Sequence, residues 1–139
     1  MLGAVDHVGY LARDLEASIE RFRSLFGLEI ARRIDRPQFD LIGAYLGDGL
    51  GSVEIFTFTD AALLAERIGD AELLLDHAAY AVADIAAAAT RMRAAGVRFT
   101  GPDARGELHE PADLGGVLHL WTDPATSDGQ MLQIFQPQS

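Results

Sequence analysis

Apolar and polar residues alternate near the start of the chain, and the same pattern returns 70 residues later. In residues 4–11, Val5-Asp6-His7-Val8-Gly9-Tyr10 has the period of two that is typical of a half-buried β-strand. Residues 75–82 repeat this pattern as Leu75-Asp76-His77-Ala78-Ala79-Tyr80. In a chain of 139 residues, this spacing predicts two copies of one structural unit.

In each copy the first strand is followed by residues at helical spacing. The first helix is predicted to begin after Asp14 and to end at Gly27, and the second to begin after Asp84 and to end at Gly96. The apolar side of the first helix is predicted to consist of Leu15, Ile19, Phe22 and Phe26. The buried edge of the second, alanine-rich helix is predicted to consist of Ile85, Ala88, Ala89 and Met92.

Three further strands are predicted in each copy. They cover residues 28–34, 39–46 and 52–58, and residues 97–100, 117–121 and 130–135. The domain is therefore expected to span residues 1–139, with unit one at 1–59, a connector at 60–74 and unit two at 75–139. Within the connector a short helix is predicted over residues 61–68, capped by Asp60 and ended by Gly69. The predicted class is α+β: two tandem β-α-β-β-β units that form one curved, cup-shaped sheet with helices outside.

Residues 101–116 form a long connection rich in glycine and proline. Connections of this length are usually functional or mobile, so we expect a lid over the site.

Strand alternation predicts which polar side chains share the concave face of the sheet. These are His7 and Glu54 in the first copy, and His77 and Gln133 in the second. Two imidazoles, one carboxylate and one amide oxygen suit one divalent metal ion, with open positions for a substrate. Nitrogen and oxygen donors do not distinguish Zn, Ni, Co, Mn and Fe.

Composition narrows the possible partners. The chain is 49% hydrophobic and 23% charged, as expected of a globular protein, and its net charge of −10 argues against nucleic acid or a membrane surface as a partner. There is no cysteine, so thiolate ligands are excluded. The N-terminus lacks the basic and apolar regions of a signal peptide, which predicts a cytoplasmic protein.

These motifs resemble the vicinal oxygen chelate superfamily, which includes glyoxalase I, methylmalonyl-CoA epimerase, extradiol dioxygenases and the bleomycin- and fosfomycin-resistance proteins. The stretches most similar to its epimerase and glyoxalase branch are Asp6-His7-Val8-Gly9, Gly96-Val97-Arg98 and Asp128-Gly129-Gln130-Met131-Leu132-Gln133. The resemblance covers the whole chain. It implies a homodimer that acts on a small-molecule substrate, with metal ligands at His7, Glu54, His77 and Gln133.

The resemblance also implies a mechanism. The metal ion binds two neighbouring substrate oxygens and stabilises the enolate or enediolate that forms when Glu54 removes a proton from the adjacent carbon. Gln133 differs from the family, which usually has a proton-transferring glutamate there, and Gln38 stands where epimerases carry a second acid-base glutamate. A glutamine side chain cannot take up the proton. A one-base proton shift, as in a glyoxalase-type isomerisation, is therefore expected.

Other residues are candidates for the rest of the site. His119 and Trp121 share one face of their strand, so His119 is either a catalytic proton donor beside the Trp121 wall or an incidental neighbour of a core tryptophan. The predicted substrate pocket consists of Phe56, Trp121, Met131, Phe135 and, for an anionic substrate, Arg105.

Three functions compete. The first is a metal-dependent lyase or isomerase of glyoxalase or epimerase type, acting on a small α-oxygenated carbonyl compound. The second is an Fe(II) dioxygenase, because two histidines and a carboxylate can form a facial triad. The third is a metal-free binding protein of the drug-resistance type.

Overall fold

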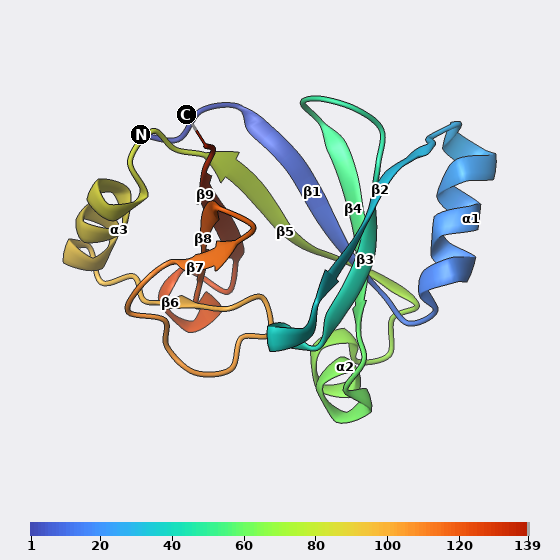
Figure 1. Ribbon diagram of the computed structural model, residues 1–139. Helices are drawn as coiled ribbons and strands as arrows, with labels where there is room; N and C mark the ends of the chain where they lie inside the picture. Colours follow the sequence, from blue (N-terminus) through green and yellow to red (C-terminus); the bar gives the residue numbers. More distant parts are fainter. Residues whose placement is uncertain (139) are drawn as a thin grey trace. The chain divides into compact units, whose positions relative to one another are not determined.

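The computed structural model describes residues 1–138 (Figure 1). This part of the chain forms two compact units. One unit is residues 7–76, and the other combines residues 1–6 with the chain from residue 77 onward. Ser139, the last residue of the predicted domain, lies outside the described residues. The α+β class and the two tandem β-α-β-β-β units are confirmed, and each unit is described separately below.

The unit of residues 7–76 is built on four strands. Its elements are β1 (Val5–Ala12, which begins in the other unit), α1 (Leu15–Phe26), β2 (Ile30–Arg36), a 3-10 turn (Pro37–Phe39), β3 (Leu41–Leu46), β4 (Ser52–Phe58), α2 (Ala61–Ile68) and the start of β5 (Leu73–Ala81). The strand order is β2-β3-β4-β1, with β1 parallel to β4 and the other pairs antiparallel. Strand β2 begins and ends two residues later than predicted and is followed by Pro37, and residues 39 and 40 belong to the turn rather than to β3.

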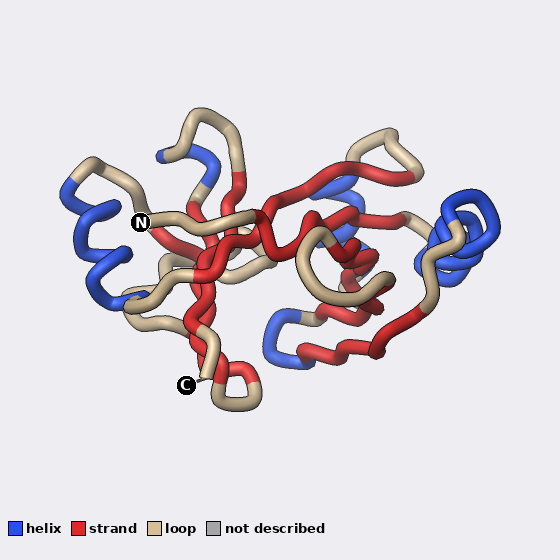
Figure 2. The backbone as a smooth tube through the Cα atoms, turned by 90° about the horizontal axis from the view of Figure 1, so that it is seen from above, coloured by secondary structure: helices blue, strands red, loops and turns tan. Residues whose placement is uncertain are grey.

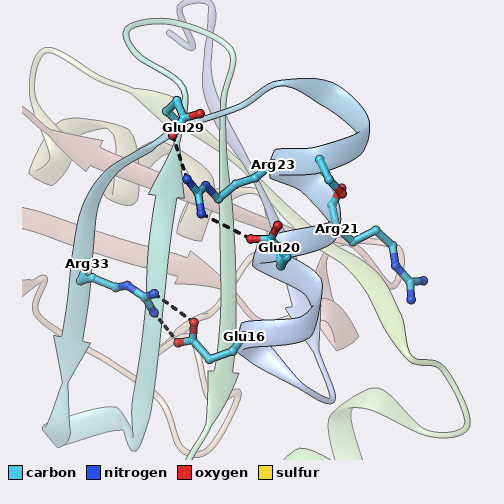
Figure 3. Close-up of polar contacts among 7 residues, drawn as sticks. Glu16, Glu20, Arg21, Arg23, Glu29 and Arg33 are labelled. Atoms are coloured by element: carbon cyan, nitrogen blue, oxygen red, sulfur yellow. Dashed lines mark hydrogen bonds and ion pairs between the residues drawn. The ribbon is translucent and has the colours of Figure 1, made fainter.

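Helix α1 begins and ends as its sequence predicts. The Asp14 carboxylate accepts a hydrogen bond from the Ala17 N–H at 3.1 Å, and Gly27 adopts a left-handed conformation with φ of 69°. Leu15, Ile19 and Phe22 are buried against one face of the sheet, but Phe26 is 64% exposed, so the apolar side ends one turn earlier than predicted. Two hydrogen bonds from Arg33 of β2 to Glu16 also link this helix to the sheet (Figure 3).

Helix α2 packs against the opposite face of the same strands. Leu63 and Ile68 form a cluster with Leu11, Phe56 and Phe58. Because side chains alternate along β4, Ile55 faces α1 and its neighbour Phe56 faces α2.

The second unit repeats this plan. It contains the rest of β5, α3 (Ile85–Ala94), β6 (Phe99–Thr100), β7 (Ala112–Leu114), β8 (Val117–Thr122), a 3-10 turn (Pro124–Thr126) and β9 (Met131–Gln136). The strand order is β5-β9-β8-β6, with β5 parallel to β9 and β7 paired to β8. Asp84 caps α3 through the Ala87 N–H, and Ile85, Ala88 and Ala89 pack on Phe99, Leu120 and Ile134.

Residues 101–116 hold a short strand that was not predicted. Ala112 pairs with His119, so the end of this stretch joins the sheet as β7. The Leu108 N–H donates to the Phe99 carbonyl at 2.8 Å, and the Arg93 guanidinium donates to the carbonyls of Leu108 and His109 at 3.2 and 3.0 Å. The remainder, between β6 and β7, is drawn as loop in Figure 2.

Within residues 1–138, none of the helices combines the length and the apolar character needed to cross a membrane.

Candidate metal and proton-transfer site

In the first unit, β1 and β4 bring a histidine and a glutamate together. Gly9 of β1 pairs with Glu54 of β4, which places His7, two residues before Gly9, diagonally beside Glu54 on the same face. His7 Nε2 and Glu54 Oε1 are 4.0 Å apart. Both residues are buried, with exposed fractions of 3% and 6%. His7 and Glu54 therefore lie on the same face of the β1–β4 pair, as strand alternation predicted.

Tyr45 completes this group. It lies opposite Glu54 in the β3–β4 pair, its ring meets the His7 ring edge-on at 5.0 Å, and its hydroxyl is hydrogen-bonded to the Glu54 carboxylate. Burial, and then the negative charge of Glu54, raise the pKa of the Tyr45 phenol, so the phenol stays protonated and donates this hydrogen bond. The Arg32 guanidinium lies 4.4 Å from the ring centroid and forms a cation–π contact.

Tyr45 was not among the residues predicted from the sequence. The signal for it was present, because Tyr45 has the strand parity that places it on the face of Glu54. Recognising it requires the register of β3 against β4, which alternation alone does not supply.

In the second unit, β5 and β9 reproduce the register of β1 and β4. Ala79 of β5 pairs with Gln133 of β9. His77 is two residues before Ala79, just as His7 is two residues before Gly9, the partner of Glu54. His77 is 5% exposed and Gln133 is 3% exposed. Each unit thus supplies one buried imidazole and one buried side-chain oxygen from two parallel strands.

His119 contacts Gln133 directly. Gln133 Nε2 and His119 Nδ1 are 2.9 Å apart, and the imidazole stacks on the rings of Trp121 and Phe135, with centroid distances of 5.7 and 5.8 Å. His119, Trp121, Gln133 and Phe135 therefore share one face of the β8–β9 pair. Met131 lies on the same face of β9 and is buried.

Three other residues singled out in the sequence, Phe56, Arg105 and Gln38, differ in how exposed they are. Phe56 is completely buried in the cluster under α2. Arg105 is exposed, with its backbone N–H donating to the Asp103 carboxylate at 3.3 Å. Gln38 is exposed in the turn that follows β2.

Comparison with known structures shows the fold of the whole chain. A variant of Streptomyces coelicolor methylmalonyl-CoA epimerase in complex with 2-nitronate-propionyl-CoA matches with a TM-score of 0.84 and 20% identity, covering 100% of both chains. Methylmalonyl-CoA epimerase from Mycobacterium tuberculosis matches with a TM-score of 0.84 and 18% identity, covering 99% of this chain and 90% of that one. A hypothetical protein from Bacillus halodurans matches with a TM-score of 0.79 and 17% identity, covering 97% and 94%.

Sequence comparison is sparser. No curated protein matches the chain. A family profile, however, matches residues 6–112, which cover β1 from its second residue, all of β5, the helices that follow these strands and the Glu54 strand. This span is well over half of the 139 residues, so the chain belongs to the glyoxalase/bleomycin resistance protein/dioxygenase superfamily.

Proposed function

We propose that this protein is a metal-dependent isomerase or lyase that moves a proton next to the carbonyl group of a small α-oxygenated substrate. The observation that carries the proposal is the buried Glu54 carboxylate, 4.0 Å from the His7 imidazole. Burying a carboxylate as an isolated charge is energetically costly. A buried carboxylate beside an imidazole is therefore a candidate for a functional site.

The proposed metal ligands are His7 and Glu54 from the first repeat and His77 and Gln133 from the second. The donor set fits a divalent ion, because neutral imidazole nitrogens and side-chain oxygens suit first-row metals. Two ligands of a tetrahedral zinc ion lie about 3.4 Å apart. The 4.0 Å between His7 Nε2 and Glu54 Oε1 is close to that spacing. When bound, such an ion supplies a Lewis acid that favours negative charge on the substrate oxygens.

Glu54 is the proposed base. It is buried on β4, and its carboxylate accepts a hydrogen bond from the Tyr45 hydroxyl. His119, whose Nδ1 lies 2.9 Å from Gln133 Nε2, is the proposed proton donor to a substrate oxygen.

A single base limits the stereochemistry of the reaction. Gln133 and Gln38 cannot accept a proton from carbon, so Glu54 both removes and returns it on one face of the substrate. This favours isomerisation of an α-hydroxy carbonyl compound over inversion at one carbon, which needs an acid-base group on each face. The structural likeness to epimerases that bind CoA compounds supports a thioester or a thiol adduct as the substrate class.

The residues proposed to contact the substrate are Trp121, Met131, Phe135 and Phe56, and Arg105 is proposed to bind an anionic group. We expect a homodimer located in the cytoplasm.

The test is proton exchange in D₂O, followed by NMR for two substrates: methylmalonyl-CoA and the hemithioacetal of methylglyoxal and glutathione. We expect deuterium at the carbon next to the carbonyl without epimerisation of the thioester, and net isomerisation of the hemithioacetal. Glu54→Gln keeps a ligating oxygen but not the base, so exchange should fall by about 10²–10⁴-fold while metal remains bound. Wild-type exchange in Glu54→Gln would rule out Glu54 as the base.

A further inference from the structure

Gln133 has two chemically different ends, and only one of them can bind a cation. The amide oxygen carries lone pairs, whereas the NH₂ group presents two hydrogens. Because Gln133 is buried between β5 and β8, the orientation of its amide decides which end is offered to a ligand. A residue that fixes this orientation would therefore determine whether Gln133 presents its oxygen to a metal ion.

His119 is placed to be that partner. Its Nδ1 lies 2.9 Å from Gln133 Nε2, and an unprotonated Nδ1 accepts a hydrogen bond from the NH₂ group. The imidazole is itself held in place, because it stacks on Trp121 with an interplanar angle of 14° and on Phe135 with one of 25°. The amide nitrogen is thus directed toward His119, and Oε1 is directed away from it.

We propose that His119 is a positioning residue that fixes the Gln133 amide so that Oε1 is presented to the metal ion. This inference rests on the proposed metal site. It goes beyond that site by assigning His119 a role that is exerted through Gln133 and does not depend on the donor role of its Nε2–H.

The first repeat supports this assignment by contrast. The ligand there is a carboxylate, which only accepts hydrogen bonds, and its partner is the Tyr45 hydroxyl, a donor. In the second repeat the ligand is an amide, and its partner on the neighbouring strand is an acceptor. The strand registers place Gly43 at the position equivalent to His119, because Gly43 pairs with Phe56 and His119 pairs with Phe135. At this position, the repeat with the amide ligand therefore has a histidine, and the repeat with the carboxylate ligand has a glycine.

The first test measures the affinity of the metal-free protein for Co²⁺, by absorption spectroscopy in competition with a chelator. His119→Phe keeps an aromatic ring against Trp121 and Phe135 but removes the acceptor, so Co²⁺ affinity should fall by about 10–100-fold. His119→Asn places its Oδ1 where Nδ1 stood and should retain an affinity close to that of the wild type. Because asparagine lacks Nε2–H, activity lost in His119→Asn with Co²⁺ still bound would separate proton donation from positioning.

A second background tests the same coupling. In Gln133→Glu either carboxylate oxygen can bind the ion, so His119→Phe should change Co²⁺ affinity much less than it does beside Gln133. An equal loss in both backgrounds would indicate a general structural effect and overturn the proposal. If Co²⁺ binding is lost in His7→Ala but unchanged in His119→Phe, only the role of His119 is refuted. If binding is unchanged in His7→Ala, the metal site fails, and this inference fails with it.

A third measurement needs no metal. Long-range ¹H–¹⁵N NMR of the metal-free protein assigns the His119 tautomer, and the proposal requires Nδ1 unprotonated and Nε2 protonated. An Nδ1–H tautomer would mean that the amide is reversed, with Oε1 accepting from His119. That result would overturn the proposal.

Discussion

At Gly43 of β3, the backbone of the neighbouring strand β4 leaves no room for a side chain. A Cβ atom built at this position would lie 2.5 Å from the carbonyl oxygen of Ile55 and 2.9 Å from Cβ of Phe56. Both are in the strand that carries Glu54, and neither is the free end of a flexible side chain. Only glycine fits here without shifting β4.

We therefore expect Gly43→Ala to lower the free energy of unfolding by about 1–3 kcal/mol, because the added methyl group overpacks the interior of the sheet. Urea denaturation of the purified protein measures this. Gly3→Ala is the control: its Cβ would lie 3.8 Å from its nearest neighbour, the Ala81 carbonyl oxygen, so a change within about 0.5 kcal/mol is expected. Equal stability of Gly43→Ala and the wild type would show that β3 and β4 separate easily.

The four proposed ligands could be predicted from strand parity and the repeat, but their partners could not. Parity places Tyr45 and His119 on the correct faces. It does not say that Tyr45 lies opposite Glu54, or that His119 reaches Gln133 diagonally, because both depend on register between strands. Register is fixed by packing of the whole sheet, including the close approach at Gly43.

The prediction of whole elements succeeded where local chemistry marks their ends. Helix α2 spans Ala61–Ile68 as predicted, because Asp60 caps it and Gly69 follows it. Strand β7 was missed because it has only three residues between Pro111 and Gly115, which is too short a stretch for alternation to identify a strand. Its pairing with β8 depends on tertiary contacts, and no local sequence pattern predicts it.

The link between α1 and β2 gives a prediction about pH. Arg33 donates two hydrogen bonds to Glu16, at 2.5 and 3.0 Å (Figure 3). These hydrogen bonds lower the pKa of Glu16 below its ordinary value of 4.5, although burial acts in the opposite direction. A lowered folded-state pKa gives stability that is present above pH 4.5 and is lost as the pH falls through the folded-state value. Because both side chains are exposed, the contribution should be less than about 1 kcal/mol.

Arg33→Ala should therefore be less stable than the wild type at pH 7, and the difference should shrink as the pH falls below 4.5. Urea denaturation at a series of pH values measures it. Arg21→Ala is the matched control on α1, because the Arg21 side chain points away from the ion pairs of Arg23 and Arg33 in Figure 3. A difference between Arg33→Ala and the wild type that grows on acidification would contradict this account.

At the scale of the whole molecule, the 70-residue repeat was the most informative signal in the sequence. It predicted two β-α-β-β-β units, and the structure shows the same strand register in both: β1 against β4, and β5 against β9. Within that shared plan the repeats differ in chemistry, with glutamate and tyrosine in one and glutamine and histidine in the other. A duplicated fold thus supplies positions, whereas substitutions within each copy determine what those positions can bind.

This duplication leads to a prediction about metal binding and stability. If the ion takes one imidazole from each repeat, binding to the folded state alone should add about 2.7 kcal/mol at a free metal concentration 100 times Kd. For a chain of this length, that corresponds to a rise in Tm of roughly 5–10 °C. Differential scanning fluorimetry with Co²⁺ or Zn²⁺, together with elemental analysis, measures the shift and the number of ions per chain.

His7→Ala and His77→Ala should both abolish the shift and the bound ion, because each removes the only imidazole that one repeat contributes to the proposed site. His109→Ala is the control, since His109 is exposed in the connection before β7 and lies outside the proposed ligand set. A shift lost in only one of the first two variants would show that one repeat holds the ion alone. The two copies would then have diverged in function, with one kept for catalysis and the other for binding the rest of the substrate.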